Sequence, residues 1–95
     1  MSYQFRQWSI PDRMMWGITQ YIEQGIPPGN FLTAIIENNL LEAIGRADDD
    51  SLANIPAYVA YFYNEAPGPC WGSPDKRRAW LAAKQEERLA KEETS

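Results

Sequence analysis

The sequence predicts an all-α fold, a compact bundle of about four helices with Pro/Gly-rich connections. Three observations favour this fold. Apolar residues recur at helical spacing in separate segments, capping residues or prolines precede those segments, and glycine or proline punctuates the connections. The 95 residues form one domain, 1–95, with no length for a second core. We expect helices over about residues 11–24, 30–45, 51–64 and 74–90.

The first helix follows a short N-terminal arm. Residues 1–9 are polar and aromatic without a period, so we expect them to dock as an arm through Phe5 or Trp8. Pro11 suits the first turn of a helix. The core face of this helix is predicted to hold Met14, Met15, Ile18, Tyr21 and Ile22. Trp16 falls on the opposite face, where it either packs against the arm or the last helix, or anchors a partner.

The helix over 30–45 is the one around which we expect the others to pack. Asn30 is a good N-cap, and Gly25 in the preceding connection is expected to adopt a left-handed conformation. The helix is apolar nearly all round, which predicts a position at the centre of the bundle or in an oligomer interface. Asn39 lies within its apolar arc. The Asn39 amide either ties down the backbone of a neighbouring loop, or lines a polar pocket, or fixes an oligomer register.

The helix over 51–64 and the loop after it carry most of the remaining aromatic side chains. Its core face is predicted to consist of Leu52, Ile55, Val59, Phe62 and Tyr63. Tyr58 and Tyr61 lie at the edge of that face, where they either belong to the core and its rim or stack a base. Trp71, in the loop, either plugs the end of the bundle or faces a partner. Beyond residue 84 the last helix becomes a charged tail, 85–95, that we expect to fray.

Charge and composition exclude several classes of function. Residues 1–75 carry three basic and nine acidic side chains, for a net charge of −6, whereas residues 76–95 carry a net charge of +2. An acidic body repels the phosphate backbone, so nucleic acid is not an expected partner. No apolar run is long enough to cross a membrane, and none resembles a signal core. With the single Cys70, this predicts a cytoplasmic protein.

The residues that most catalytic chemistry needs are missing. The sequence contains no His, which excludes Ser-His-Asp triads, Cys-His pairs and His-containing metal sites. One Cys cannot build a structural zinc site. We therefore expect no enzyme, no metal and no cofactor. The four Trp and five Tyr side chains suit recognition instead.

Several short motifs resemble a family of small uncharacterised proteins of tailed bacteriophages. They are Gly-Ile-Pro-Pro-Gly-Asn-Phe-Leu-Thr-Ala from Gly25, Glu-Ala-Ile-Gly-Arg-Ala-Asp from Glu42, Tyr-Asn-Glu-Ala-Pro from Tyr63, and Pro-Cys-Trp-Gly-Ser from Pro69, followed by Trp80. The resemblance covers roughly residues 10–82. It implies a phage setting, in the cytoplasm of an infected bacterium, and no particular mechanism.

Our first hypothesis is a non-enzymatic phage accessory protein that binds and modulates or inhibits a host bacterial protein, including one used in defence. The candidate partner-binding residues are Trp16, Tyr58, Tyr61 and Trp71. The alternative is a small-ligand binder that sequesters a cyclic nucleotide signal, with Asn30, Asn39, Arg46, Tyr58 and Tyr61 as ligand-binding residues. A weaker alternative is a DNA-associated regulator that uses Lys76, Arg77, Arg78, Lys84 and Arg88. The helix over 30–45 also makes a homo-oligomer possible.

Overall fold

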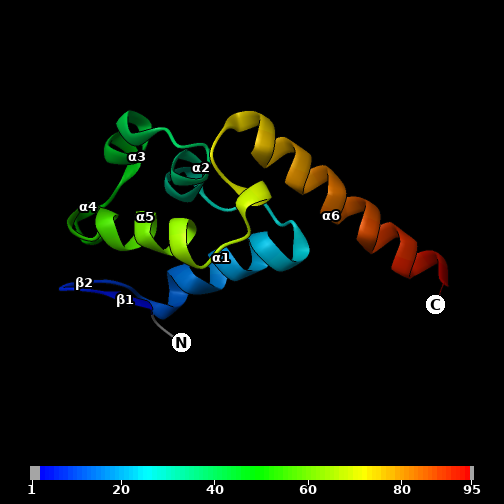
Figure 1. Ribbon diagram of the computed structural model, residues 1–95, viewed down its shortest axis with the longest axis horizontal. Coiled ribbons are helices and arrows are strands. Elements are labelled where there is room, and N and C mark those ends of the chain that lie inside the picture. Colours follow the sequence, from blue (N-terminus) through cyan, green and yellow to red (C-terminus); the bar gives the residue numbers. More distant parts are fainter. Residues whose placement is uncertain (1–2, 95) are drawn as a thin grey trace.

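The computed structural model describes residues 3–94 and is mostly helical over that range. Its α-helices are α1 (Asp12–Gln24), α2 (Asn30–Ile36), α3 (Leu40–Arg46), α4 (Asp49–Ala53), α5 (Ile55–Asn64) and α6 (Pro74–Thr94), with a 3-10 turn η1 (Gly68–Cys70). Figure 1 shows α1, α2 and α5 grouped together, while α6 extends away from them to the C-terminal end. The prediction of a helical globule is confirmed, but the fold is not purely α and has more and shorter helices than expected.

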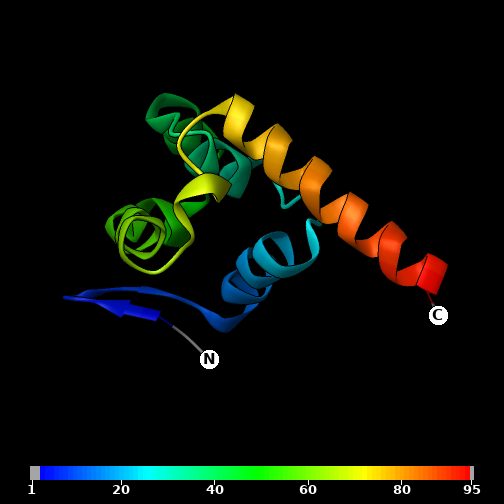
Figure 2. The ribbon, with the colours of Figure 1, turned by 45° about the vertical axis from the view of Figure 1, so that its right-hand side comes forward.

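A β-hairpin replaces the predicted arm. Strands β1 (Tyr3–Phe5) and β2 (Trp8–Ile10) pair antiparallel, and Arg6 in the tight turn between them has a φ of 55°. Side chains alternate between the two faces of a strand, so one face of the hairpin carries Tyr3, Phe5, Trp8 and Ile10. This face packs against the core, which confirms the expected docking through Phe5 and Trp8. Figures 1 and 2 show the hairpin running alongside α5. Three-residue strands are too short to produce a period in the sequence.

The predicted helix over 30–45 is two helices, because the chain breaks at residues 37–39. Asn38 adopts a left-handed conformation with a φ of 61°, and the next amide, Asn39 N–H, donates to the Ala34 carbonyl at 2.9 Å. This is the usual way in which a helix ends in a left-handed residue. The Asn39 side chain then accepts a hydrogen bond from Glu42 N–H at 3.2 Å and caps α3. Asn39 is exposed, so the prediction of an amide within the apolar arc was wrong.

The predicted helix over 51–64 also divides in two, at Asn54. The Asp48 side chain accepts from Ser51 N–H at 2.7 Å and caps α4, which therefore starts before residue 51. The expected core face was wrong at Leu52, Val59 and Tyr63, which are 46%, 48% and 76% exposed. The buried residues of α5 are Ala57, Tyr58, Ala60 and Phe62. A helix with apolar residues on several sides does not reveal from its sequence which side its neighbours cover.

Helix α2 lies at the centre of the core, as predicted for the N-terminal half of the segment over 30–45. Phe31, Leu32, Ala34, Ile35 and Ile36 are all buried there. They belong to one cluster with Ile18 and Tyr21 of α1 and Phe62 of α5. Tyr21 donates its hydroxyl hydrogen bond to the Cys70 carbonyl at 2.7 Å, which ties α1 to η1. Helix α3, in contrast, leaves most of its apolar side chains exposed.

Helix α6 is fastened to the rest of the molecule through its first half. The Trp80 indole N–H lies 3.3 Å from the carbonyl of Tyr21 and 3.2 Å from that of Ile22, at the end of α1. Arg77 Nε lies 2.5 Å from Glu37 Oε2, just beyond α2. The helix continues to Thr94, beyond the predicted end near residue 90. The prediction that the tail 85–95 frays stays a prediction. No helix of the described part has the length and hydropathy that a membrane span requires.

Candidate functional site

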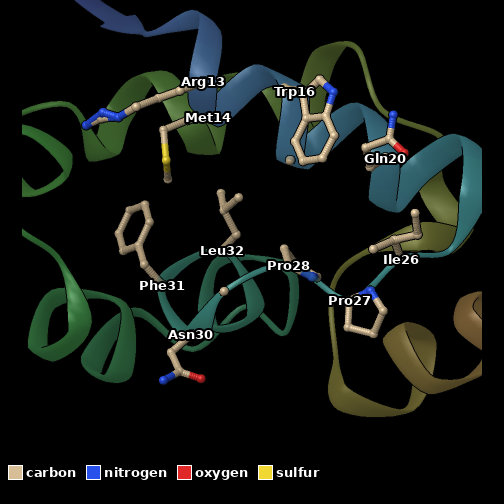
Figure 3. Close-up of a pocket in the computed structure, with 12 residues that line it drawn as sticks. Arg13, Met14, Trp16, Gln20, Ile26, Pro27, Pro28, Asn30, Phe31 and Leu32 are labelled. Atoms are coloured by element: carbon tan, nitrogen blue, oxygen red, sulfur yellow. The ribbon is translucent and has the colours of Figure 1, made fainter.

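An apolar cleft of about 420 Å³ lies between α1 and α2. Figure 3 shows Trp16 pointing from α1 into the space above Pro28, while Met14 faces Phe31 and Leu32 of α2. The other lining residues are Arg13, Gly17, Gln20, Ile26, Pro27, Gly29 and Asn30. The volume falls in the range of ligand and side-chain pockets, and the lining is mostly hydrophobic with a few polar groups, as such pockets usually are. We call this feature the α1–α2 cleft.

Local chemistry accounts for the shape of the cleft. At one point α1 and α2 come so close that a Cβ added to Gly17 would lie 3.4 Å from Leu32 Cδ1. Gly25 ends α1 in a left-handed conformation, as predicted, and Pro27 and Pro28 prevent helix α2 from starting at once. The connection therefore contributes one side of the cleft, where Ile26 remains 40% exposed.

Trp16 is the most accessible of the four predicted partner anchors. Its side chain is 67% exposed, although it belongs to the lining of the cleft, so the alternative that it packs against the arm or the last helix was wrong. A large aromatic side chain at the edge of a preformed apolar cleft is an arrangement typical of binding hot spots. The sequence already set Trp16 apart, because it is the one large aromatic residue on the polar side of its helix.

The cleft lies in an acidic body, but its own lining carries a positive charge. Arg13 is the only charged side chain in the lining. Hydrogen bonds from the Ser51 backbone and side chain hold the pKa of Asp48 below its usual range, and Arg13 acts in the same direction. The Arg13 charge is therefore opposed by a nearby carboxylate, and residues 1–75 retain their net charge of −6. The acidic body attracts positively charged partners from a distance, whereas Arg13 in the lining repels them at close range.

Tyr58 does not form part of any exposed site. It is 1% exposed, its ring meets Phe31 edge to face at 5.0 Å, and burial raises the pKa of its hydroxyl. The predictions that Tyr58 anchors a partner or stacks a base were wrong, because the hairpin and α2 cover the side of α5 on which it lies. Tyr61 is partly buried and contacts Tyr3 and Phe62 edge to face at 5.2 and 5.6 Å.

Trp71 lies at a second, smaller hollow. It is partly buried, and its ring centroid is 6.4 Å from that of Phe62. Together with Leu40 of α3 and Val59 of α5 it lines an apolar hollow of about 50 Å³. The two predicted tryptophan anchors therefore belong to separate surfaces of the molecule.

The structure brings three of the five predicted nucleotide-binding residues together. Asn30, Asn39 and Arg46 line a shallow polar hollow of about 140 Å³. Its lining contains no aromatic ring, and it includes the carboxylates of Glu37 and Glu42. Arg46 Nε lies 3.4 Å from Glu42 Oε2. The Glu42 carboxylate beside the arginine opposes the binding of a phosphate.

The basic side chains of α6 are largely paired with acids. Arg77 pairs with Glu37, Arg78 pairs with Asp75, and Lys84 Nζ lies 3.1 Å from a Glu87 oxygen and 5.0 Å from the Trp80 ring centroid. These pairs leave little positive charge for a DNA backbone.

Sequence reasoning missed the side of the cleft made by Ile26, Pro28 and Leu32. The sequence did contain a sign of this side of the cleft. The Pro-Pro connection reverses the direction of the chain after the helix that carries Trp16, which brings the connection back towards that helix. Within residues 3–94, no group of three or more His, Cys, Asp or Glu side chains is placed to hold a metal ion. No protein-family model, curated protein or solved structure matches the chain.

Proposed function

We propose that this chain is a non-enzymatic phage accessory protein that binds a basic segment of a host bacterial protein in the α1–α2 cleft and so modulates or inhibits that protein. The observation that carries the proposal is Trp16, 67% exposed at an apolar cleft in an acidic body.

The cleft suits one or two apolar side chains of a protein partner. Its floor consists of Phe31 and Leu32, which are already buried in the core and therefore hold the floor rigid. A preformed, rigid site lowers the ordering cost of binding. Trp16 at the edge adds a large contact area that a docked side chain would desolvate further. Truncation of an aromatic hot-spot residue typically costs about 2 kcal/mol or more.

Charge supports a basic segment as the occupant. Residues 1–75 hold nine acids and three arginines, and one of those arginines, Arg46, pairs with Glu42 away from the cleft. A positively charged partner would be attracted from a distance and then held by apolar contact. Binding of this kind weakens as salt increases, because salt screens the attraction.

The biological setting rests on the sequence resemblance alone. A phage protein of this kind would act in the cytoplasm of the infected bacterium, and a host protein would be its natural partner. By covering the segment that it binds, the chain would compete with whatever normally uses that segment, which is how a small non-catalytic protein inhibits a larger one.

The alternative of a nucleotide signal as ligand has weaker support. It is favoured by the grouping of Asn30, Asn39 and Arg46 in one hollow. It is disfavoured by the two carboxylates of that hollow and by the burial of Tyr58. Thermal stabilisation by a panel of cyclic nucleotides, lost in Arg46→Ala, would favour it over the protein partner.

The test uses three forms of the tagged protein in bacterial lysate: wild type, Trp16→Ala and the control Leu89→Ala, whose leucine is 51% exposed on α6. We expect one host protein to bind wild type and Leu89→Ala, and to be lost in Trp16→Ala and at high salt. With that protein purified, calorimetry should give a Kd about 30-fold weaker for Trp16→Ala. Equal capture by all three forms, or none by any, contradicts the proposal. Circular dichroism of each variant separates lost binding from lost folding.

A further inference from the structure

A second apolar surface lies on α3 and α5, apart from the cleft. It consists of Leu40, Leu41, Ile44, Val59 and Tyr63, which are 58%, 82%, 47%, 48% and 76% exposed. Leu40 and Val59 line the same hollow, Ile44 follows Leu40 by one helical turn, and Tyr63 follows Val59 by one turn. Leu41 precedes Ile44 by three residues, so it lies on the same side of α3. We call these five side chains the α3–α5 surface. Exposed apolar patches of this kind mark interaction sites.

This surface contains both a projection and a hollow. Leu41 is 82% exposed, which makes it the most exposed of the large hydrophobic side chains. Leu40, the residue before it, lines the hollow of about 50 Å³, whose lining is mostly apolar (Ile35, Leu40, Val59, Phe62 and Trp71) and includes Asn38 and Asn39. A twofold interface needs a surface that is complementary to itself, so that a projection on each copy meets a hollow on the other. The α3–α5 surface fulfils that condition.

The lack of charge on the surface favours a second copy over the basic partner that suits the cleft. The five side chains of the surface carry no charge, and the nearby Glu42 and Arg46 pair with each other on the side of α3 that faces the polar hollow. A basic partner would gain no attraction here. Two copies, each with a net charge of −4, repel each other wherever acidic faces meet, so a neutral apolar face is the one through which they associate best.

We infer that the protein forms a twofold dimer in which the α3 helices of two copies lie antiparallel and Leu41 of each copy enters the hollow between α3 and α5 of the other.

The antiparallel arrangement also avoids a clash of acidic residues. The run Asp48–Asp50 follows the C-terminal end of α3, so an antiparallel pair places the two runs at opposite ends of the contact. A standard interface covers about 800 Å² per partner, or about one eighth of the 6091 Å² surface of one copy.

The experiment is light scattering after size-exclusion chromatography at several protein concentrations, on wild type, Leu41→Arg and the control Leu89→Arg. Both leucines are exposed, so neither substitution disturbs the core. We expect wild type and Leu89→Arg to be dimers at high micromolar concentration and Leu41→Arg to be a monomer. Higher salt should strengthen the dimer by screening the repulsion between copies, whereas it weakens binding of the proposed basic partner.

A second measurement uses uncharged substitutions, so its result does not depend on whether the fold tolerates a new arginine. Cys70 is buried, so a cysteine introduced on the surface is the one thiol open to mild oxidation in the folded protein. Leu41→Ser should raise the dimer dissociation constant at least tenfold, and Ile44→Cys should cross-link covalently while Leu89→Cys does not. A monomeric wild type, or a dimer that persists in both Leu41 variants, overturns the inference. Neither result bears on the α1–α2 cleft.

Discussion

Two separate constraints require glycine at position 25, where α1 ends against α6. Its φ of 68° is a conformation that side chains with a Cβ rarely adopt. A Cβ placed on it would lie 2.4 Å from the Cβ of Lys84, which is too close for any real contact. Because Trp80 binds the carbonyls at the end of α1 close to this point, α6 cannot move away without losing those hydrogen bonds.

Gly25→Ala should therefore lower the free energy of unfolding by about 2 kcal/mol or more, through left-handed strain and the clash with Lys84. Gly45→Ala is the matched control, since a Cβ there meets nothing within 4 Å and the residue lies in helix α3. It should raise the free energy of unfolding by about 0.5 kcal/mol. Urea titration of both variants gives the two values. Equal effects would show that neither constraint operates.

At the scale of elements, two adjacent asparagines divide one apolar segment into two helices. Asn38 supplies the left-handed residue that ends α2, and the Asn39 side chain caps α3. The Gly72 N–H also donates to the Ile36 carbonyl at 2.7 Å, so the loop before α6 covers the end of α2. The break turns α3 out of the core and thereby exposes the side chains of the α3–α5 surface.

Asn39→Ala should destabilise the protein by about 1 kcal/mol, because the Glu42 N–H loses its acceptor at the start of α3. Asn39→Ser keeps a capping oxygen and should remain within about 0.5 kcal/mol of wild type. Chemical unfolding monitored by circular dichroism distinguishes the two. If both substitutions cost the same, the residue contributes through something other than the cap.

The elements that could be predicted are those whose ends are set by local chemistry. Pro11 before α1, Gly25 after it and Pro74 at the start of α6 all stand where the sequence placed them. The break at Asn38 was missed because apolar residues recur at helical spacing across residues 30–45, and two asparagines alone do not show that a helix ends there. The left-handed Asn38, the Asn39 cap and the loop at Gly72 together favour two helices over one. The core side of α5 was missed for a similar reason, since the hairpin that covers it gave no periodic signal. Trp16 could be singled out from the sequence because its isolation on a polar helix face is a local property.

At the scale of the whole molecule, the core contains several groups that lose protons only at high pH. Burial is the largest cause in each case: it raises the pKa of Cys70 from 9.0 to about 11 and the pKa values of Tyr21, Tyr58 and Tyr61 above their ordinary value of 10.0. These groups come from α1, α5 and η1 and meet around α2. The folded protein therefore holds these protons at pH values at which the unfolded chain releases them.

Stability should thus be complete below about pH 9 and fall as the pH rises towards 11 and beyond, because the unfolded state binds fewer protons there. Each group contributes a slope of up to about 1.4 kcal/mol per pH unit between its unfolded and folded pKa values. Urea unfolding at pH 7, 9, 10 and 11 measures the fall, and Tyr58→Phe should make it shallower above pH 10. A free energy of unfolding that stays level to pH 11 would mean that water reaches these side chains in the folded protein, and that the core around α2 is more open than its burial indicates.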